Sequence, residues 1–340
     1  MAYQDFIPQN VAPLGTRRIG VYDANGNRVG QIPLGSLTPP TPGRKLYSFG
    51  ALSDVHIGYD TAETDFSTAL TYLHDSESVS FTCICGDLTG DGSNTQLSQY
   101  KTIVNGRSVY AIAGNHEGMT ADVENRIATY TGHPLYYSFT HGNDVFIMVG
   151  TIGGEMYSNG VVFASGELQW LYETLEANRN KRCFVFQHIF AGVEKKAVCG
   201  NAGGLYTNWC WHNTNECLVF ESLMSHYKNV TWFHGHSHLK YSLQKYGQLY
   251  ANYSETDGYR SVHIPSLTAP REDTDGDGTY ENVYAESEGY VVDVYENGIH
   301  LRGRDFVKGE FLPIASYWLD TTLQTVPAGT YTDSTGTITT

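Results

Sequence analysis

Residues of types that bind metals stand at the ends of several short apolar runs along this chain. They occur in the segments SDVHIG, CGDLTG, GNHE, FQH and HGHSH. The candidate ligands are Asp54, His56, Asp87, Asn115, His188, His236 and His238. A mixture of imidazole nitrogens with carboxylate and amide oxygens suits first-row transition metals such as Mn, Fe or Zn. The set is larger than one ion needs, so the sequence predicts a site for two divalent transition-metal ions.

The spacing within the ligand pairs agrees with a shared site. Asp54 and His56 are separated by one residue, and so are His236 and His238. In an extended segment such spacing places both side chains on the same side of the chain. A glycine precedes three of the candidate ligands, and these glycines are Gly86, Gly114 and Gly235. Glycine permits a sharp turn and a close approach of substrate.

An alternation of buried strands and helices is expected to position these residues. Apolar runs typical of buried strands are YSFGALSD, FTCICGD, SVYAIAG, DVFIMVG, RCFVFQH and VTWFHGH. Helical patterns such as TAETDFSTALTYLHDS and GELQWLYETLEANRN lie between several of them. This order indicates an α/β domain, in which ligands bind where the strands end. After His238, the runs YSLQKYGQLYANYS, YRSVHIPSL and EGYVVDVYENGIHLRGRDF predict antiparallel hairpins, one of them turned at Asn297-Gly298.

Three regions are expected along the chain. Residues 1–45 contain two strand-like runs around Asn25-Gly26 and then the linker LTPPTPG, which predicts a small N-terminal β-hairpin extension. Residues 46–312 carry all of the candidate ligands and form the predicted catalytic domain. Residues 313–340 end in a Thr-, Gly- and Ser-rich stretch and are expected to be a C-terminal tail.

The ordered ligand blocks resemble the calcineurin-like metallophosphoesterase superfamily, whose pattern is D-x-H, G-D, G-N-H-[DE], H and G-H-x-H. All five blocks are present in this order within about residues 46–312. The resemblance implies a four-layer α/β/β/α sandwich. It also implies hydrolysis of phosphodiester or phosphomonoester bonds through attack by a water molecule that bridges two metal ions.

The resemblance further implies a division of the ligands between the two ions. One ion would be held by Asp54, His56 and His238, the other by Asn115, His188 and His236, with Asp87 bridging them. His116 would be the general acid for the leaving group and not a ligand. Relatives often read G-D-x-x-D, whereas here Gly90 holds the last place and Asp91 follows it. Asp91 is therefore the candidate to orient His116.

The substrate is predicted less directly. The aromatic and glycine-rich stretch 190–217 follows His188, and its Tyr206, Trp209 and Trp211 are candidate walls of a substrate pocket. A self-packed loop remote from the substrate is the alternative interpretation. The net charge of −15 disfavours nucleic acid as a partner and favours a small-molecule or nucleotide phosphoester, with a nuclease or a protein phosphatase ranked lower.

The cellular setting gives a second hypothesis. No apolar run reaches the ~20 residues of a membrane span, and the first thirty residues contain no apolar signal core. These observations predict a cytoplasmic or particle-associated protein without a membrane partner. In the particle-associated alternative, residues 1–45 would anchor a phage-like or cell-surface assembly that carries the phosphoesterase. One disulfide among Cys199, Cys210 and Cys217 is left open.

Overall fold

The computed structural model describes most of the expected catalytic domain and part of the N-terminal extension. The described residues are 18–22, 28–33, 42–152, 163–189, 215–241, 251–253, 260–272, 274 and 281–321. Strands β1 (Arg18–Tyr22) and β2 (Arg28–Pro33) pair antiparallel as a two-stranded sheet. This pairing confirms the predicted hairpin. None of the described helices is long and apolar enough to cross a bilayer.

The first large sheet has six strands in the order β16-β15-β14-β3-β4-β5. Its members are β3 (Lys45–Leu52), β4 (Phe81–Ile84), β5 (Val109–Ala111), β14 (Glu288–Tyr295), β15 (Gly298–Asp305) and β16 (Glu310–Asp320). β3, β4 and β5 run parallel, whereas β14, β15 and β16 add antiparallel pairs. The predicted turn at Asn297-Gly298 joins β14 to β15. β16 extends past the expected boundary at residue 312, and its Pro313 is tolerated because β16 is an edge strand.

The second large sheet has the order β10-β11-β9-β8-β7-β6. Its members are β6 (Tyr137–His141), β7 (Asp144–Val149), β8 (Cys183–Gln187), β9 (Val230–His234), β10 (Ala251–Tyr253) and β11 (Arg260–His263). β11 lies within the run that was expected to form only antiparallel hairpins. It pairs antiparallel with β10 but parallel with β9, so that expectation is corrected. β12 (Arg271–Glu272) and β13 (Glu281–Asn282) form a separate short ribbon.

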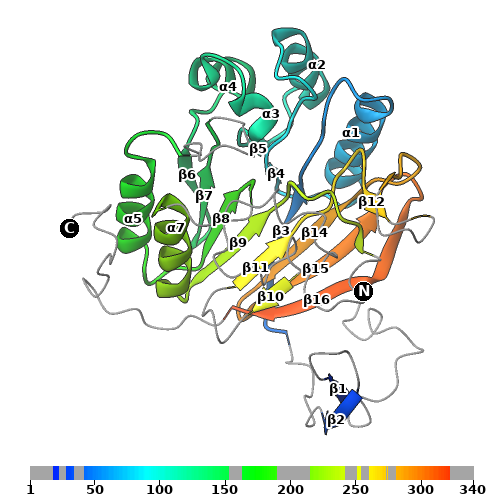
Figure 1. The fold of residues 1–340 in the computed structure, drawn as a ribbon, viewed down its shortest axis with the longest axis vertical. Helices are drawn as coiled ribbons and strands as arrows, with labels where there is room; N and C mark the ends of the chain where they lie inside the picture. The colour runs from blue at the N-terminus through cyan, green and yellow to red at the C-terminus, as the bar shows by residue number, and fades with distance from the viewer. Residues whose placement is uncertain are drawn as a thin grey trace.

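The two sheets face each other across an aromatic core. Phe49 and Phe81 of the first sheet pack with Phe146 and Phe184 of the second. Helices cover both outer faces (Figure 1). They are α1 (Ala62–Thr71), continued by a π-helical turn η3 (Tyr72–Ser76), α2 (Asn94–Val104) and α4 (Val123–Thr131) on one side, and α5 (Glu167–Ala177) and α7 (Asn215–His226) on the other. The four-layer α/β/β/α sandwich is confirmed.

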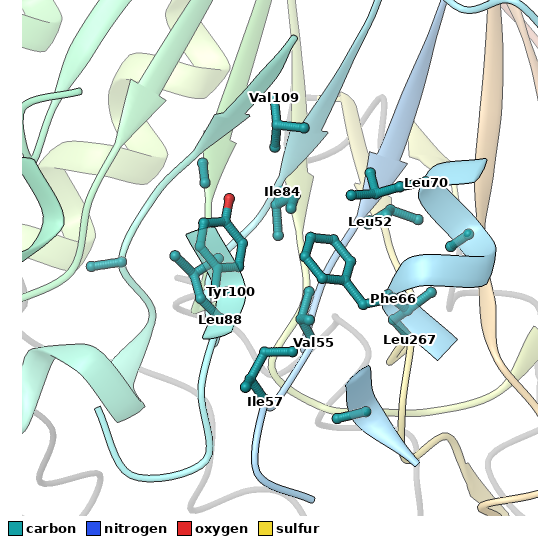
Figure 2. Close-up of a cluster of buried hydrophobic side chains, with 14 of the residues drawn as sticks. Leu52, Val55, Ile57, Phe66, Leu70, Ile84, Leu88, Tyr100, Val109 and Leu267 are labelled. Carbon is teal, nitrogen blue, oxygen red and sulfur yellow. The ribbon is translucent and has the colours of Figure 1, made fainter. Parts of the chain in front are cut away.

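The core under α1 and α2 reaches the loops that follow the strands. Figure 2 shows Phe66 of α1 and Tyr100 of α2 close to Val55 and Leu88. The Phe66 and Tyr100 rings are stacked, with centroids 5.4 Å apart. Val55 and Leu88 are fully buried next to two of the candidate ligands in the sequence. Burial of these apolar neighbours therefore fixes the loops that carry the ligands.

A buried polar contact joins the two sheets at the N-terminal ends of β3, β7 and β8. The guanidinium of Arg182 donates to both carboxylate oxygens of Asp144, at 3.0 and 2.6 Å, and also to the Tyr295 carbonyl oxygen at 2.7 Å. The Tyr47 hydroxyl donates to Asp144 at 2.5 Å. Tyr47 and Tyr295 belong to the first sheet. Asp144 is the first residue of β7 in the second sheet, and Arg182 directly precedes β8 of the same sheet. The charged pair therefore ties the layers together.

Candidate functional site

The predicted metal ligands lie together at the opposite end of the sandwich. Each follows the C-terminal end of a strand: β3, β4 and β5 of the first sheet, and β8 and β9 of the second. The residues are Asp54, His56, Asp87, Asn115, His188, His236 and His238, and none is more than 5% exposed. Burial of so many ionisable groups in one place requires a partner for their charges and lone pairs.

The side chains form two groups that share one member. Asp54, His56, Asp87 and His238 form the first group, and Asp87, His188 and His236 form the second. Within each group, the potential ligand atoms lie within 4.8 Å of one another. The Asn115 Oδ1 lies 3.1 Å from the His188 Nε2 and so adjoins the second group. Asp87 thus has the position expected of a bridging ligand.

Backbone carbonyls fix the orientation of two of the histidine rings. The Nδ1 of His188 lies 2.6 Å from the Cys85 carbonyl oxygen, and the Nδ1 of His238 lies 3.1 Å from the Ala269 carbonyl oxygen. A carbonyl can only accept a hydrogen bond, so each Nδ1 carries the proton. The Nε2 of a neutral ring then presents its lone pair to the centre, which is the usual arrangement of metal-binding histidines.

This arrangement brings acceptor atoms face to face. The His188 Nε2 lies 3.1 Å from the Asp87 Oδ2 as well as from the Asn115 Oδ1. The Asp54 Oδ1 is buried and accepts no hydrogen bond from the described residues. It nevertheless lies 3.1 Å from the His238 Nε2. Such acceptor contacts are favourable only with a cation or a proton between the atoms, so the residues fit a pair of divalent ions.

The charges of the site shift the pKa values of its groups in opposite directions. Burial alone would lower the pKa of His188, but the carboxylates of Asp87 and Asp54 raise it to about 9. Burial, together with the neighbouring His238, lowers the pKa of His56 to about 3. Burial, together with His188, lowers the pKa of His236 to about 4. The neighbouring carboxylates thus favour a proton on His188, whereas burial disfavours one on His56 and His236.

The backbone at the ligands has an uncommon conformation. Five of them have φ between 48° and 71°, in the left-handed region, namely Asp54, His56, Asp87, His236 and His238. Residues other than glycine adopt this region at a cost, and they do so most often at functional sites. Of the preceding glycines, Gly86 has a positive φ as well, whereas Gly114 serves a different need, since a Cβ at Gly114 would lie 2.2 Å from the Asp87 Oδ1. Close packing of the loops therefore explains the glycine predicted there.

Glu117 joins two of these loops from beneath, a role that the sequence did not predict. Its carboxylate is fully buried and accepts hydrogen bonds from the backbone N–H groups of Leu88, Thr89 and Gly114, at 3.2, 2.9 and 3.0 Å. The Thr89 hydroxyl donates a fourth bond at 2.6 Å. Glu117 thereby connects the loop of Asp87 to the short helix α3 (Asn115–Gly118). The GNHE block contained this residue, but nothing in the block showed its partners.

His116 stands at the edge of the cluster. Its Nε2 lies 3.8 Å from the Asp87 Oδ2, and its side chain is 22% exposed. The orienting contact predicted for Asp91 is made instead by the Gly90 carbonyl oxygen, which lies 2.6 Å from the His116 Nδ1. Asp91 is exposed, and its carboxylate accepts a hydrogen bond from the Ser93 N–H at the start of α2. The turn at Gly90 therefore directs the carboxylate into a local cap.

The predicted substrate walls are not among the described residues. Tyr206, Trp209 and Trp211 lie outside them, as do Cys199 and Cys210. An aromatic residue that the sequence analysis did not single out borders the site. The ring of Tyr59 is stacked on His56, with centroids 4.6 Å apart and planes 4° from parallel. Tyr59 is only half-buried, so it forms part of the rim beside the metal ligands.

The part of the chain that carries the candidate ligands matches a known protein family. A family model described as calcineurin-like phosphoesterase matches residues 47–240. A predicted phosphoesterase from Streptococcus pneumoniae is 10% identical, with 81% of this chain and 97% of that one covered and a TM-score of 0.38. Vacuolar Protein Sorting 29 from Cryptosporidium parvum is 12% identical, with 82% and 100% covered and a TM-score of 0.39. A search of curated proteins gave no match.

Proposed function

The chain belongs to the calcineurin-like phosphoesterase family, and we propose that it hydrolyses a small-molecule or nucleotide phosphoester with the help of two divalent ions. The observation that supports this proposal best is the pair of buried ligand groups that share Asp87. In the proposed arrangement, Asp54, His56 and His238 hold one ion, and Asn115, His188 and His236 hold the other. Mn, Fe and Zn all suit this donor set.

Two bound ions would neutralise the phosphoryl oxygens and lower the pKa of an attacking water molecule. The chain's own residues supply the remaining steps. His116 is the site histidine that a substrate can reach, and the Gly90 carbonyl fixes its ring through the Nδ1. In the protonated ring, the Nε2–H is free to be donated to the oxygen of the leaving group. General acid catalysis of this kind contributes typically 10²–10⁴-fold to the rate.

The charge of the protein supports a small substrate. The chain carries 21 basic and 36 acidic residues, which gives a net charge of −15. Tight binding of polymeric nucleic acid requires clustered Lys and Arg that release counterions from the backbone. The proposal therefore favours a phosphodiester or phosphomonoester of low molecular weight over DNA or RNA.

The experiment measures hydrolysis of bis-p-nitrophenyl phosphate and p-nitrophenyl phosphate, with added Mn²⁺ and with a chelator. Asp87→Asn is expected to remove metal-dependent turnover of both esters. His116→Asn is expected to bind Mn²⁺ like the wild type but to hydrolyse phenyl phosphate, an added ester with a poor leaving group, at least about 100-fold more slowly, with a smaller loss on the p-nitrophenyl esters. His133→Asn, at a half-buried histidine far from the ligands in sequence, is the matched control. Turnover that persists in chelator and in Asp87→Asn would contradict the proposal.

Residues 1–45 are proposed as an assembly contact of a particle-associated or cytoplasmic enzyme. The support is the separate two-stranded sheet β1–β2, which precedes the catalytic sandwich in the chain. Deletion of residues 1–41 tests this idea, because the ordered contact between Gly43 and Asn297 is then retained. An unchanged oligomeric state and unchanged hydrolysis would leave the extension without an assembly role.

A further inference from the structure

A short segment beyond the family match packs against the first group of ligands. We name residues 264–271 the strap. The strap follows β11, and the amide N–H of Ile264 donates to the His234 carbonyl oxygen at 2.7 Å. Leu267 is fully buried in the hydrophobic cluster under α1, as Figure 2 shows. The strap is therefore a fixed part of the core and not a surface loop.

Hydroxyl groups of the strap hold the backbone at Asp54. The Ser266 hydroxyl donates to the Asp54 carbonyl oxygen at 3.1 Å, and the Thr268 hydroxyl donates to the Val55 carbonyl oxygen at 2.6 Å. The Leu267 N–H donates to the Ser53 carbonyl oxygen at 3.0 Å. Asp54 has a φ of 54°. A left-handed conformation persists in such a residue only where its surroundings hold it, and the strap supplies these contacts.

The same hydroxyl is also linked, through Ala269, to His238, another ligand of the first group. The Ala269 N–H donates to the Ser266 Oγ at 3.1 Å. The Ala269 carbonyl oxygen in turn accepts a hydrogen bond from the His238 Nδ1–H at 3.1 Å. Ser266 therefore connects the backbone of Asp54 with Ala269, the residue whose carbonyl orients the His238 ring. The Asp54 Oδ1 and the His238 Nε2 end up 3.1 Å apart, on the side where an ion would lie.

We propose that Ser266 is a positioning residue for the metal ion held by Asp54, His56 and His238. Its hydroxyl sets the direction of the Asp54 carboxylate and, through Ala269, the direction of the His238 lone pair. The inference rests on the proposed metal-dependent function, since it assigns Ser266 to one of the two ions. Ser266 is fully buried, and no motif of the sequence marks it. Contacts that orient ligands from outside typically change metal affinity 10–100-fold when they are removed.

The test measures Mn²⁺ binding to the metal-stripped full chain by calorimetry and by the electron paramagnetic resonance of free Mn²⁺. Ser266→Ala is expected to weaken one of two binding steps about 10-fold or more and to leave the other unchanged. Ser266→Cys keeps a weaker donor of similar size and is expected to lie between Ser266→Ala and the wild type. Ser48→Ala is the matched control, because it removes a buried serine hydroxyl that donates to Asp293, at 2.7 Å, in the N-terminal half of β3. It is expected to bind both ions within about threefold of the wild type.

Two results would overturn the inference. One is wild-type affinity for both ions in Ser266→Ala, and the other is an equal loss of affinity in Ser48→Ala. Thermal unfolding without metal distinguishes a loss of fold from a loss of affinity. If Ser266→Ala does not fold, the Mn²⁺ affinity of Ser266→Cys is compared with that of the wild type instead. Failure of the proposed function has a separate signature. In that case the wild type binds Mn²⁺, and the Ser266 series still shows its order, but no ester is hydrolysed.

Discussion

Replacement of Glu117 by glutamine is the most direct test of how the loops beneath the site are joined. Among the described residues, the hydrogen-bond partners of the Glu117 carboxylate are four donors, namely three backbone N–H groups and the Thr89 hydroxyl. Burial raises the pKa of Glu117, and the neighbouring Asp87 raises it further, while bonds from Thr89 and Gly114 act against both. Because all four of these partners donate, we expect the ionised form in the folded protein at neutral pH.

The cost of Glu117→Gln follows from these contacts. In the better amide orientation, the oxygen keeps Leu88 and Gly114, and the Thr89 hydroxyl turns to accept from the new NH₂ group. The Thr89 N–H then faces a donor and loses its acceptor. A buried donor without a partner costs about 1–3 kcal/mol, and the loss of charge assistance adds to this. At about 2 kcal/mol, the melting temperature should fall by roughly 3–4 °C, because an unfolding entropy of about 2.1 cal/mol/K per residue amounts to roughly 0.6 kcal/mol/K for the catalytic domain.

The assay is urea and thermal unfolding of the metal-free protein, followed by Mn²⁺ titration. Glu310→Gln, at an exposed position on the edge strand β16, is the matched control and should unfold like the wild type. Mn²⁺ affinity of Glu117→Gln should also fall, since Glu117 connects the loop of Asp87 to that of Asn115. A variant with a stability within 0.5 kcal/mol of the wild type, a surface-like effect, would refute the ionised four-donor interpretation.

Three further predictions concern packing, pH and metal removal. Gly114→Ala should abolish tight Mn²⁺ binding in calorimetry, because the new Cβ would lie 2.2 Å from the Asp87 Oδ1. Gly132→Ala is the control. It should bind Mn²⁺ normally despite a strained φ, since no atom lies within 4 Å of its Cβ. Burial raises the pKa of Glu167 from 4.5 to about 8, so the folded state holds a proton that the unfolded state has lost, and stability should fall as pH rises through this window. Glu167→Gln should lack this pH dependence, and in urea unfolding at pH 9 its free energy of unfolding should exceed that of the wild type by at least about 1 kcal/mol. Parallel pH profiles of stability in the two proteins would contradict the assignment. Added Mn²⁺ should raise the melting temperature of the wild type, a chelator should reverse the shift, and Asp87→Asn should show neither effect.

The sequence predicted the sandwich and the grouping of the ligands because both depend on side-chain type. Apolar runs that end in Asp, His or Asn mark strands whose C-terminal ends meet, and the structure places Asp54, Asp87 and His188 within reach of one another. Glycines beside the ligands were also visible, and Gly114 has the close approach that its position suggested.

The features that were missed depend on backbone atoms or on pairing across the chain. His116 is oriented by a carbonyl oxygen, which every residue has, so the sequence directed attention to the nearest carboxylate, Asp91. Ser266 lies in a loop whose hydroxyl contacts cannot be recognised without the fold. β11 has only four residues, and its parallel partner β9 lies far away in the chain, so local periodicity could not show its direction. The expected boundary at residue 312 likewise missed the continuation of β16 to Asp320.

The Arg182 contact holds the two layers together at the end of the sandwich opposite to the metal ligands. That end is pinned by a buried ion pair with Asp144 and by the hydroxyl of Tyr47. At the ligand-bearing end, Asp54 and Asp87 follow strands of the first sheet, whereas His188, His236 and His238 follow strands of the second. Bound ions would therefore join the two layers at this end through ligands from both sheets. Binding of Mn²⁺ should therefore slow amide exchange at the C-terminal ends of β3, β4, β8 and β9. Amide exchange next to the Arg182 contact should stay unchanged.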